Sequence, residues 1–426
     1  MDIADQIKTN DKNKSKLTKK KKMIILANYK YMEDTQSTMS IFLNFDIAPE
    51  TFRQEYLYQK PKLFKNAVIN LEAVSWDEIN GLYQRANPAA PLFHLRKKGV
   101  IVPKEEYVEI FDDLGNIRHR FIKPVIYEHM RNGASLIYNH INNEPFSDGI
   151  ARQIGALAQA HTVTSAYLCF GSDESYKNHW DTRDVYAVQL VGKKRWYLSA
   201  PNFPQPLYMQ QTKDLNVTEP DTVDYDIVLE AGDVLYIPRG WWHNPIPMGC
   251  ESFHLAVGTF PPNGYDYLEW LMWKGQGKIP EIESLRHSFT NWQTDKERLV
   301  DVAEKIACII CSPERYAAFL EEFLGKKRTD SIFNLEKFAN PQASILTDDL
   351  KVRLNTVNAS TAKQGLLIAN GTKINAQGAG CEVLAFISTH QPVAISKVLA
   401  QFDAAKHEEI RELLTRLADL DAVEVF

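Results

Sequence analysis

The sequence predicts an α+β chain in which a barrel or sandwich of short strands is followed by two further units. Three observations carry this prediction. Short runs rich in β-branched and aromatic residues, separated by turn residues, recur up to Phe260. After Pro261 and Pro262 apolar residues recur at helical spacing. Segment 346–426 then combines a hairpin, three short helices and a closing strand, a pattern typical of a winged helix.

The bulk composition is that of ordinary globular protein. The chain has 426 residues, 44% of them hydrophobic, which favours two or three structural units. Its lysine-rich start has no apolar core, and no apolar run is long enough to span a membrane. Five scattered cysteines indicate a reducing compartment. We therefore expect a cytoplasmic protein without membrane contact.

The first 38 residues are polar and contain a run of lysines that ends at Lys22. We expect segment 1–38 to be a disordered basic tail. Alternatives are a nuclear-localisation or RNA-binding arm, or sequence upstream of a true start at Met23 or Met39. The nucleus therefore stays open as a location. The net charge of −5 gives no whole-protein argument for nucleic-acid binding.

Segment 39–264 is expected to form the first globular domain. Its pattern indicates several helices, a hairpin that turns at Gly115–Asn116, and strands interrupted at Pro245. Segment 201–226 is too long for a passive connection, so it is a candidate substrate-side loop. The helices are expected at Phe52–Tyr58, Leu71–Gln84 (with Ser75 as a possible N-cap) and Phe146–Gln159, and the strands at Ala134–His140, Val163–Phe170, Val185–Val191, Arg195–Leu198, Ile227–Leu229, Asp233–Ile237 and Phe253–Gly258.

Segment 265–345 is expected to be helical. A capping box, Thr294 to Glu297, would open a helix that ends before Pro313. Strongly apolar helices beside a β domain favour a homodimer interface, and simple packing on the barrel is the alternative. The Cys308-x-x-Cys311 pair lies in an apolar helix without a second pair, so we interpret it as core.

Segment 346–426 is expected to be a winged-helix-like domain. A hairpin around Asn370–Gly371 precedes helices at Cys381–Ser388, Ala394–Phe402 and Lys406–Leu420. Winged helices often bind DNA, but the candidate recognition stretch QPVAISKVLAQF is not notably basic. We therefore favour a protein-interaction role over nucleic-acid binding.

Three side chains suggest a metal centre. His179 and Asp181 are two positions apart, so on extended chain they point the same way and can chelate one ion. His243 follows a Gly-Asp strand and a Pro-Arg-Gly turn and can supply the third ligand. Two imidazoles and one carboxylate leave positions open for a 2-oxo acid and O2, the arrangement of non-haem Fe(II) oxygenases. Zinc, or a vestigial site, is the alternative.

A 2-oxo acid such as 2-oxoglutarate also carries a distal carboxylate, which needs a cation inside the barrel. Lys194 is the candidate, because a buried lysine requires a partner, and basic residues flank it on both sides. Tyr167 could add a hydroxyl. His254 and Ser252 could line the pocket, or His254 could be a core histidine. Arg183 and Asp184 would lie at the pocket mouth or form surface salt bridges, and the flanking basic residues are Lys193 and Arg195.

Two stretches, HWDTRDVYAVQLVGKKRWYL (179–198) and LEAGDVLYIPRGWWH (229–243), resemble the JmjC/cupin group of ribosomal oxygenases, which hydroxylate ribosomal proteins. EYLYQKPKLF (55–64) is similar to the lead-in helix and turn of that group. The resemblance implies a double-stranded β-helix, the JmjC/cupin barrel, followed by a helical dimerisation region and a winged helix. It also implies iron ligation by His179, Asp181 and His243, with Lys194 and Tyr167 at the cosubstrate.

The resemblance implies an Fe(II)- and 2-oxoglutarate-dependent hydroxylase of a protein side chain, with a ribosomal protein as the expected partner. Sequences with HWDT also occur in enzymes that tailor ribosomally made precursor peptides, so a peptide substrate is an alternative. Lysine demethylation is another. From a different class comes a non-catalytic cupin and winged-helix regulator, which the intact ligand set argues against.

Overall fold

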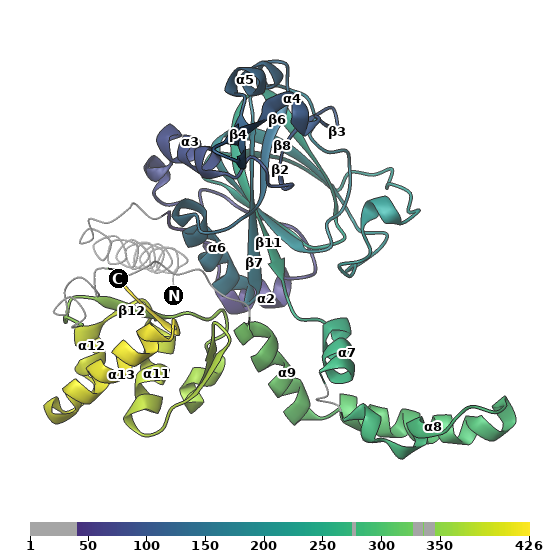
Figure 1. Ribbon diagram of the computed structural model, residues 1–426, viewed down its shortest axis with the longest axis vertical. Helices are drawn as coiled ribbons and strands as arrows, with labels where there is room; N and C mark the ends of the chain where they lie inside the picture. The colour runs from purple at the N-terminus through teal and green to yellow at the C-terminus, as the bar shows by residue number, and fades with distance from the viewer. Residues whose placement is uncertain (1–40, 275–277, 327–334, 336–345) are drawn as a thin grey trace, which may run out of the picture. The chain divides into compact units, whose positions relative to one another are not determined.

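The computed structural model describes residues 41–274, 278–326, 335 and 346–426 (Figure 1). The predicted basic tail, 1–38, therefore lies outside the described residues. Within the described part of the chain, no helix is both long and apolar enough to cross a lipid bilayer.

The first domain is built on one antiparallel sheet. Its strand order is β1-β10-β8-β11-β7-β6-β2-β3, and β9 pairs with the far end of β8. Strands distant in sequence are thus neighbours, and β8 lies between β10 and β11. The bounds are β1 (Lys62–Phe64), β2 (Phe93–Lys97), β3 (Val100–Ile101), β6 (Ser135–Ile141), β7 (His161–Cys169), β8 (Asp184–Ser199), β9 (Tyr225–Glu230), β10 (Val234–Ile237) and β11 (Trp242–Phe260).

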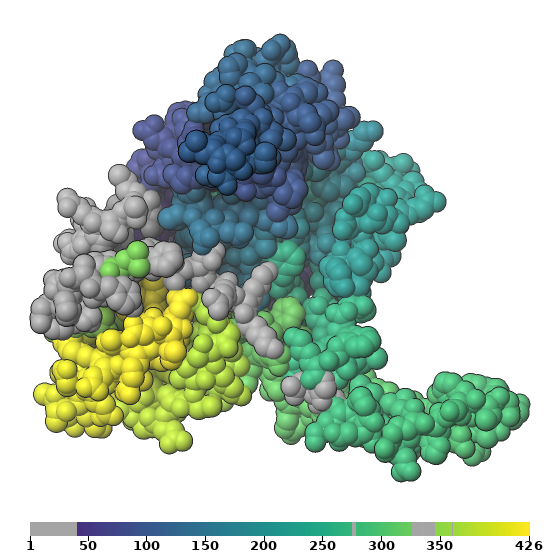
Figure 2. Space-filling model, viewed as in Figure 1, coloured from purple at the N-terminus to yellow at the C-terminus, as the bar shows by residue number. Residues whose placement is uncertain are grey.

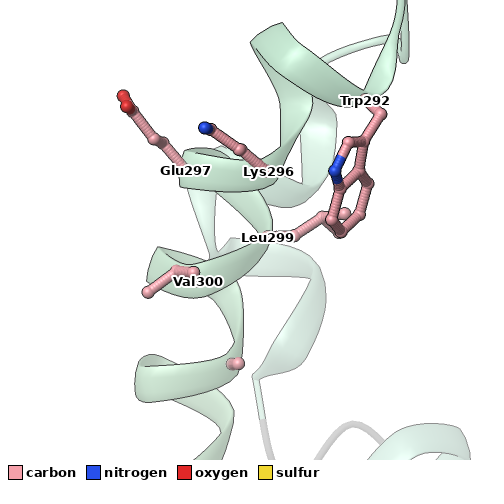
Figure 3. Close-up of a pocket in the computed structure, with 6 residues that line it drawn as sticks. Trp292, Lys296, Glu297, Leu299 and Val300 are labelled. Carbon is pink, nitrogen blue, oxygen red and sulfur yellow. The ribbon is translucent and has the colours of Figure 1, made fainter.

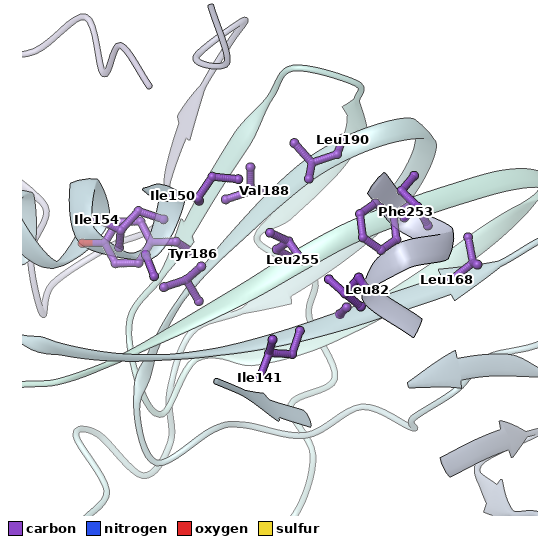
Figure 4. Packing of buried hydrophobic residues seen from close by; sticks show 14 of the residues in the cluster. Leu82, Ile141, Ile150, Ile154, Leu168, Tyr186, Val188, Leu190, Phe253 and Leu255 are labelled. Atoms are coloured by element: carbon purple, nitrogen blue, oxygen red, sulfur yellow. The ribbon is translucent and has the colours of Figure 1, made fainter. Parts of the chain in front are cut away.

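One face of this sheet carries the main hydrophobic core. Side chains alternate along a strand, so Phe253 and Leu255 of β11 point to the same face, where they meet residues of two helices (Figure 4). Helix α6 supplies Ile150 and Ile154, and α3 supplies Leu82. The intervening residues of β11 point to the opposite face, away from this core. The covering helices are α2 (Pro49–Glu55), α3 (Trp76–Arg85) and α6 (Pro145–Ala158).

Strand β11 runs through Pro245, where the sequence predicted a break. The backbone N–H of His243 donates to His179 rather than to β8. By alternation, the nitrogens of Pro245 and Pro247 also face away from β8, toward an edge where β7 has not yet begun to pair. Proline is tolerated in a strand where its missing N–H would have had no ladder partner. The prediction of a break was therefore wrong.

Two other local predictions need correction. The hairpin of β4 (Val108–Asp113) and β5 (Asn116–Phe121) turns at Leu114–Gly115, one residue earlier than predicted. Both turn residues have positive φ, 53° and 83°, as a tight hairpin turn requires. Segment 71–73 is a separate 3-10 turn, and α3 begins after Ser75, whose side chain accepts from the N–H of Glu78. Short helices α4 (Lys104–Tyr107) and α5 (Lys123–Arg131) flank the hairpin.

The second region is helical. It contains α7 (Gly264–Trp273), the 3-10 turns Ile279–Glu281 and Glu283–Arg286, α8 (Trp292–Ile310) and α9 (Pro313–Lys326). The predicted capping box at Thr294 was wrong, because Asn291 caps α8 and accepts from the N–H of Thr294. The interpretation of Cys308 and Cys311 as core was also wrong. Both are exposed, because most of the α8 surface is uncovered in a single chain (Figure 2).

The C-terminal domain has its own core. Strands β15, β12 and β16 form a small sheet packed with three helices, and β13 and β14 form a hairpin whose turn is Asn370–Gly371, as predicted. This arrangement of three helices and a winged hairpin fits the predicted shape. The bounds are β12 (Lys351–Leu354), β13 (Leu366–Ala369), β14 (Thr372–Asn375), α11 (Ala379–His390), β15 (Val393–Ala394), α12 (Ile395–Leu399), α13 (His407–Asp419) and β16 (Val423–Val425).

Candidate metal centre

The three predicted ligands converge where β8 and β11 begin. His179 precedes β8 and forms an isolated antiparallel bridge with His243, the second residue of β11. Their backbones exchange two hydrogen bonds, of 2.8 and 3.2 Å. Asp181 lies between His179 and β8. Ligand atoms of His179, Asp181 and His243 all lie within 4.8 Å of one another, close enough to share one ion.

Hydrogen bonds orient both imidazoles for metal binding. Nδ1 of His179 donates to the carbonyl of Lys177 at 2.7 Å, and Nδ1 of His243 donates to that of Trp241 at 3.0 Å. A carbonyl can only accept, so Nδ1 carries the proton and Nε2 keeps its lone pair. Such outer hydrogen bonds are typical of metal-ligating histidines. The residues present therefore fit a divalent transition-metal ion.

The charge states also suit a metal. Burial, and after it the neighbouring His179, lowers the pKa of His243 to about 4, so the ring is neutral at physiological pH. Burial acts to raise the pKa of Asp181, but Arg183 and the two histidines outweigh it and lower that pKa. A carboxylate and a neutral imidazole result, and together with His179 they form the ligand set of the facial triad of non-haem iron.

The long segment 201–224 holds the ligand-bearing loop. The hydroxyl of Thr212 accepts from the N–H of Trp180 at 3.0 Å and donates to its carbonyl at 2.9 Å. The Trp180 ring lies between Phe203 and Trp242, with ring centroids 5.7 and 4.8 Å away. None of the described residues of this segment lines the adjoining cavity. The segment therefore positions Trp180, the residue between the ligands His179 and Asp181. The sequence predicted a loop on the substrate side and not this role.

A cavity of about 170 Å³ opens beside the three ligands, on the sheet face opposite the core. It contains three of the four predicted cosubstrate residues, Lys194, Tyr167 and His254. Ser252 is not among its lining residues, and its hydroxyl instead accepts from the Gln189 amide at 3.0 Å. The other lining residues are Leu92, Asn139, His140, Ser165, Ser175, Tyr176, His179, Asp181, Arg183, Val185, Trp196, His243, Pro245, Ala256 and Gly258.

Strand alternation distinguishes Lys194 from its basic neighbours. Lys194 is 2% exposed, whereas Lys193 is exposed and Arg195 pairs with Asp226, with N···O distances of 2.7 Å or less. Burial lowers the pKa of Lys194, partly offset by the Cys169 thiol. This ammonium therefore has much to gain from an anion. A buried cation without a carboxylate among the described residues around it is what a cosubstrate anchor requires.

Two aromatic side chains flank that ammonium. His254 stacks on Tyr167 with ring centroids 4.9 Å apart, and its Nδ1 has no hydrogen-bond partner among the described residues. Burial and the nearby Lys194 hold its pKa well below the usual value, so the ring is neutral. The Tyr167 hydroxyl donates to Asn139 at 3.4 Å. Both side chains thus offer a polar atom to a ligand bound at Lys194.

Sequence reasoning missed some of the wall and misplaced one acid. Tyr176 and Asn139 line the cavity, but neither belongs to a motif that identifies it. Asp184 does not lie at the mouth. It is fully buried, accepts from the N–H of Arg239 at 2.8 Å, and burial raises its pKa to about 6. Arg183 does line the cavity, as expected.

Two families of known proteins match parts of the chain. A family described as "JmjC domain" matches residues 136–267, and one described as "ROXA-like winged helix" matches residues 301–424. The fold class predicted from the sequence is thereby confirmed. The second match begins within α8 and includes α9, so the helical region and the C-terminal domain are matched together.

Curated relatives resemble part of the chain. "Ribosomal oxygenase 1" of Gallus gallus is 27% identical over 241 residues, 53% of this chain and 37% of that protein. "Bifunctional lysine-specific demethylase and histidyl-hydroxylase NO66" of Dictyostelium discoideum is 27% identical over 154 residues, 35% of this chain and 29% of that protein. Human "tRNA wybutosine-synthesizing protein 5" is 39% identical over 103 residues, 21% of this chain and 32% of that protein. The chain thus matches about a third of each relative.

Solved structures resemble nearly all of the chain. The Escherichia coli ribosomal oxygenase YcfD superposes with a TM-score of 0.57 and 17% identity, over 91% of this chain and all of the other. Its complex with cobalt and 2-oxoglutarate gives a TM-score of 0.56 and 16% identity, over 91% of this chain and 99% of the other. At this identity the likeness establishes a shared fold.

Proposed function

We propose that this chain, a JmjC-domain protein with a ROXA-like winged helix, is an Fe(II)- and 2-oxoglutarate-dependent oxygenase that hydroxylates a protein side chain. The observation that carries the proposal is the combination of the oriented ligand triad with the buried Lys194 in one cavity. Neither element alone selects oxygenase chemistry. Together they provide a metal with open positions and a cation for a dicarboxylate.

Each residue has a role in this proposal. His179, Asp181 and His243 would hold the ion, and Lys194 would bind the distal carboxylate of 2-oxoglutarate. Bound iron supplies the oxidation of the substrate by O2, coupled to decarboxylation of 2-oxoglutarate to succinate and CO2. Tyr167 and His254 orient the cosubstrate through their ring edges and exclude water from the cavity floor. The protein's contribution is therefore positioning and desolvation.

The proposed substrate is a ribosomal protein. The chicken relative and the E. coli structure are both named ribosomal oxygenases, and they match 53% and 91% of this chain. The human relative named for tRNA wybutosine synthesis supports tRNA as a second candidate, because it has the highest identity of the three relatives compared here. The net charge of −5 gives no support to RNA binding, so we favour protein.

The test combines turnover with product mapping. Purified protein would be incubated with Fe(II), ascorbate, 2-oxoglutarate and either ribosomal proteins or bulk tRNA. We expect succinate formation that depends on substrate, and a peptide heavier by one oxygen atom in mass spectrometry. His179→Ala and Asp181→Ala should abolish both, while exposed Arg131→Gln should change neither. Turnover retained in either ligand variant, or modification confined to tRNA, would contradict the proposal.

We also propose that the chain forms a homodimer through α8. A shallow hollow on this helix is lined by apolar and charged side chains that include Trp292 and Val300, 68% and 58% exposed (Figure 3). Contiguous exposed apolar surface of this kind marks an interaction site. Trp292→Glu should convert a dimer to a monomer in light scattering, and Leu114→Glu, at the tip of the exposed β4–β5 hairpin, should not. A monomeric wild-type protein would sink this idea.

Two further parts of the proposal concern the cell. We place the protein in the cytoplasm, in agreement with its five free cysteines.

We assign the winged helix to protein interaction. Its second helix, α12, has Lys397 as its one basic residue, which provides little charge for a DNA groove. Tight, salt-sensitive binding of duplex DNA to the full chain would contradict this assignment.

A further inference from the structure

Arg183 presents an unpaired guanidinium to the cavity beside the metal ligands. It lines the cavity, and no hydrogen bond or ion pair of its side chain is found among the residues that the structure describes. Its charged end lies 6.0 Å from the centroid of the Phe260 ring, and its charge helps to lower the pKa of Asp181. Unpaired arginines are common on open surfaces, but this one faces an enclosed site where ligands bind.

The neighbouring strand makes room for this side chain. A Cβ atom at Gly258 would lie 2.5 Å from Cδ of Arg183, well inside van der Waals contact. Glycine at this point of β11 therefore lets the stem of Arg183 lie against the strand backbone and directs it along the cavity wall. The position of the guanidinium is thus set by two residues, Arg183 just before β8 and Gly258 on the adjacent β11.

A charge count shows what the guanidinium lacks. Among the lining residues, Asp181 is the one carboxylate, while Lys194 and Arg183 are cationic. A divalent metal, Asp181 and the two cations sum to about +3, and 2-oxoglutarate brings −2. Lys194 and the metal account for the two carboxylates of the cosubstrate. One positive charge, that of Arg183, remains in the loaded site, and it has no counter-ion.

We propose that Arg183 recognises a carboxylate of the substrate, so that the enzyme acts on an acidic residue or on a residue next to one. This inference rests on the proposed oxygenase function and narrows its substrate class. A guanidinium binds a carboxylate through two parallel hydrogen bonds, which fix orientation as well as charge. The same positive charge disfavours lysine and arginine as the side chain that enters the cavity. Arg183 is therefore a specificity-determining residue.

The carboxylate could belong to an Asp or Glu side chain, to a chain terminus, or to 2-oxoglutarate itself. Two measurements separate these sources. In the first, full-length protein loaded with Co(II) and N-oxalylglycine selects from a synthetic pool of random octapeptides, made once with amidated and once with free C-termini. Bound peptides are identified by mass spectrometry. In the second, calorimetry measures the affinity of Co(II)-loaded protein for 2-oxoglutarate without peptide.

The wild-type protein should enrich Asp- or Glu-containing amidated peptides about tenfold over their frequency in the pool. Arg183→Gln should lose this enrichment, Arg183→Lys should keep part of it, and Arg183→Glu should shift selection toward Lys and Arg. Enrichment confined to free C-termini would assign the terminal carboxylate instead of a side chain. The exposed arginine variant Arg131→Gln, on α5, is the matched control and should select like the wild type.

Three results would overturn the inference. They are no acidic enrichment by the wild type, an enrichment that Arg183→Gln retains, or a tenfold loss of 2-oxoglutarate affinity in that variant, which would give Arg183 to the cosubstrate. The selection measures binding, so it remains informative for a protein without turnover. Absence of succinate formation with intact acidic selection would refute the proposed oxygenase activity and leave the role of Arg183 standing.

Discussion

Replacing Lys194 with methionine should have opposite effects on the empty and the cosubstrate-bound protein. The ammonium is 2% exposed, and burial lowers its pKa because no described carboxylate compensates the charge. Methionine has a similar length and no charge, so Lys194→Met removes the cost of burying a cation in the empty protein. It also removes the proposed partner of the distal carboxylate of 2-oxoglutarate.

The two effects differ in size. Relief of an uncompensated buried charge is worth about 1–3 kcal/mol, which raises the melting temperature of a domain of this size by roughly 2–8 °C. Loss of a buried charge pair costs about 3–5 kcal/mol of binding, or roughly a 150-fold to 4,000-fold weaker 2-oxoglutarate affinity. At a cosubstrate concentration 100 times the wild-type Kd, the wild type gains about 2.7 kcal/mol of stability and the variant almost none.

Thermal unfolding followed by fluorescence, with Co(II) and with or without 2-oxoglutarate, measures both effects. Lys193→Met is the matched control, since its side chain is exposed on the same strand. A variant that melts below the wild type when empty would show that Lys194 has a compensating partner. If 2-oxoglutarate still raised the melting temperature of Lys194→Met, a residue other than Lys194 would bind its distal carboxylate.

Three further variants test local features of the fold. Burial raises the pKa of Asp184 from 3.8 to about 6. The ionised carboxylate therefore destabilises the folded state above about pH 6, and this cost disappears as the pH falls toward 4. In denaturant titrations, Asp184→Asn should be more stable than the wild type by up to about 3 kcal/mol at pH 8 and equally stable at pH 4. A constant difference across that range would contradict this account. Asn291→Ala should lower the stability by about 1 kcal/mol through loss of the α8 N-cap, and Thr294→Ala by less than half of that. A larger loss for Thr294→Ala in the same titrations would show that Thr294, as the sequence predicted, is the capping residue. Gly192→Ala should destabilise the protein by more than about 2 kcal/mol, because Gly192 has a φ of +64° and its Cβ would lie 1.8 Å from a carbonyl oxygen of β11. Gly115→Ala, in a turn with open space around it, should cost only about 1 kcal/mol. Equal losses would show that β8 and β11 can move apart at Gly192.

The ligand motif was predictable because its parts are local in sequence. Spacing two places His179 and Asp181 on one face of extended chain, and the Gly-Asp and Pro-Arg-Gly turns identify the strand that brings His243. The structure adds the bridge between the two histidines and the carbonyls that fix their Nδ1 protons. Those carbonyls are backbone atoms that every residue has, so no residue type in the sequence could predict them.

Other features depend on pairing across the sheet, which alternation along one strand does not determine. Ser252 and His254 lie on the same side of β11 and were both expected at the cosubstrate, but only His254 lines the cavity, and the Ser252 hydroxyl accepts from the Gln189 amide of β8. Asp184 resembled a surface charge because its partner, the backbone N–H of Arg239, belongs to a turn more than fifty residues away. The α8 cap was misplaced for a more local reason, since Asn291 and Thr294 are both good capping residues and only the start of the helix distinguishes them.

The dependence on pairing across the sheet also explains why the sequence indicates the proposed oxygenase chemistry more readily than it indicates the substrate. Metal ligands and the cosubstrate anchor must satisfy the fixed geometry of an ion and a small dicarboxylate, so they recur as short motifs. The proposed substrate would meet Asn139, Tyr176 and Arg183, which come from β6, the loop after β7 and the residue before β8 and form one wall only after the sheet has folded. Of these, the guanidinium has the longest electrostatic reach. Its charge acts on Asp181, a metal ligand, but it forms no ion pair among the described residues. The charge of the substrate is therefore the first property of the target that the structure predicts.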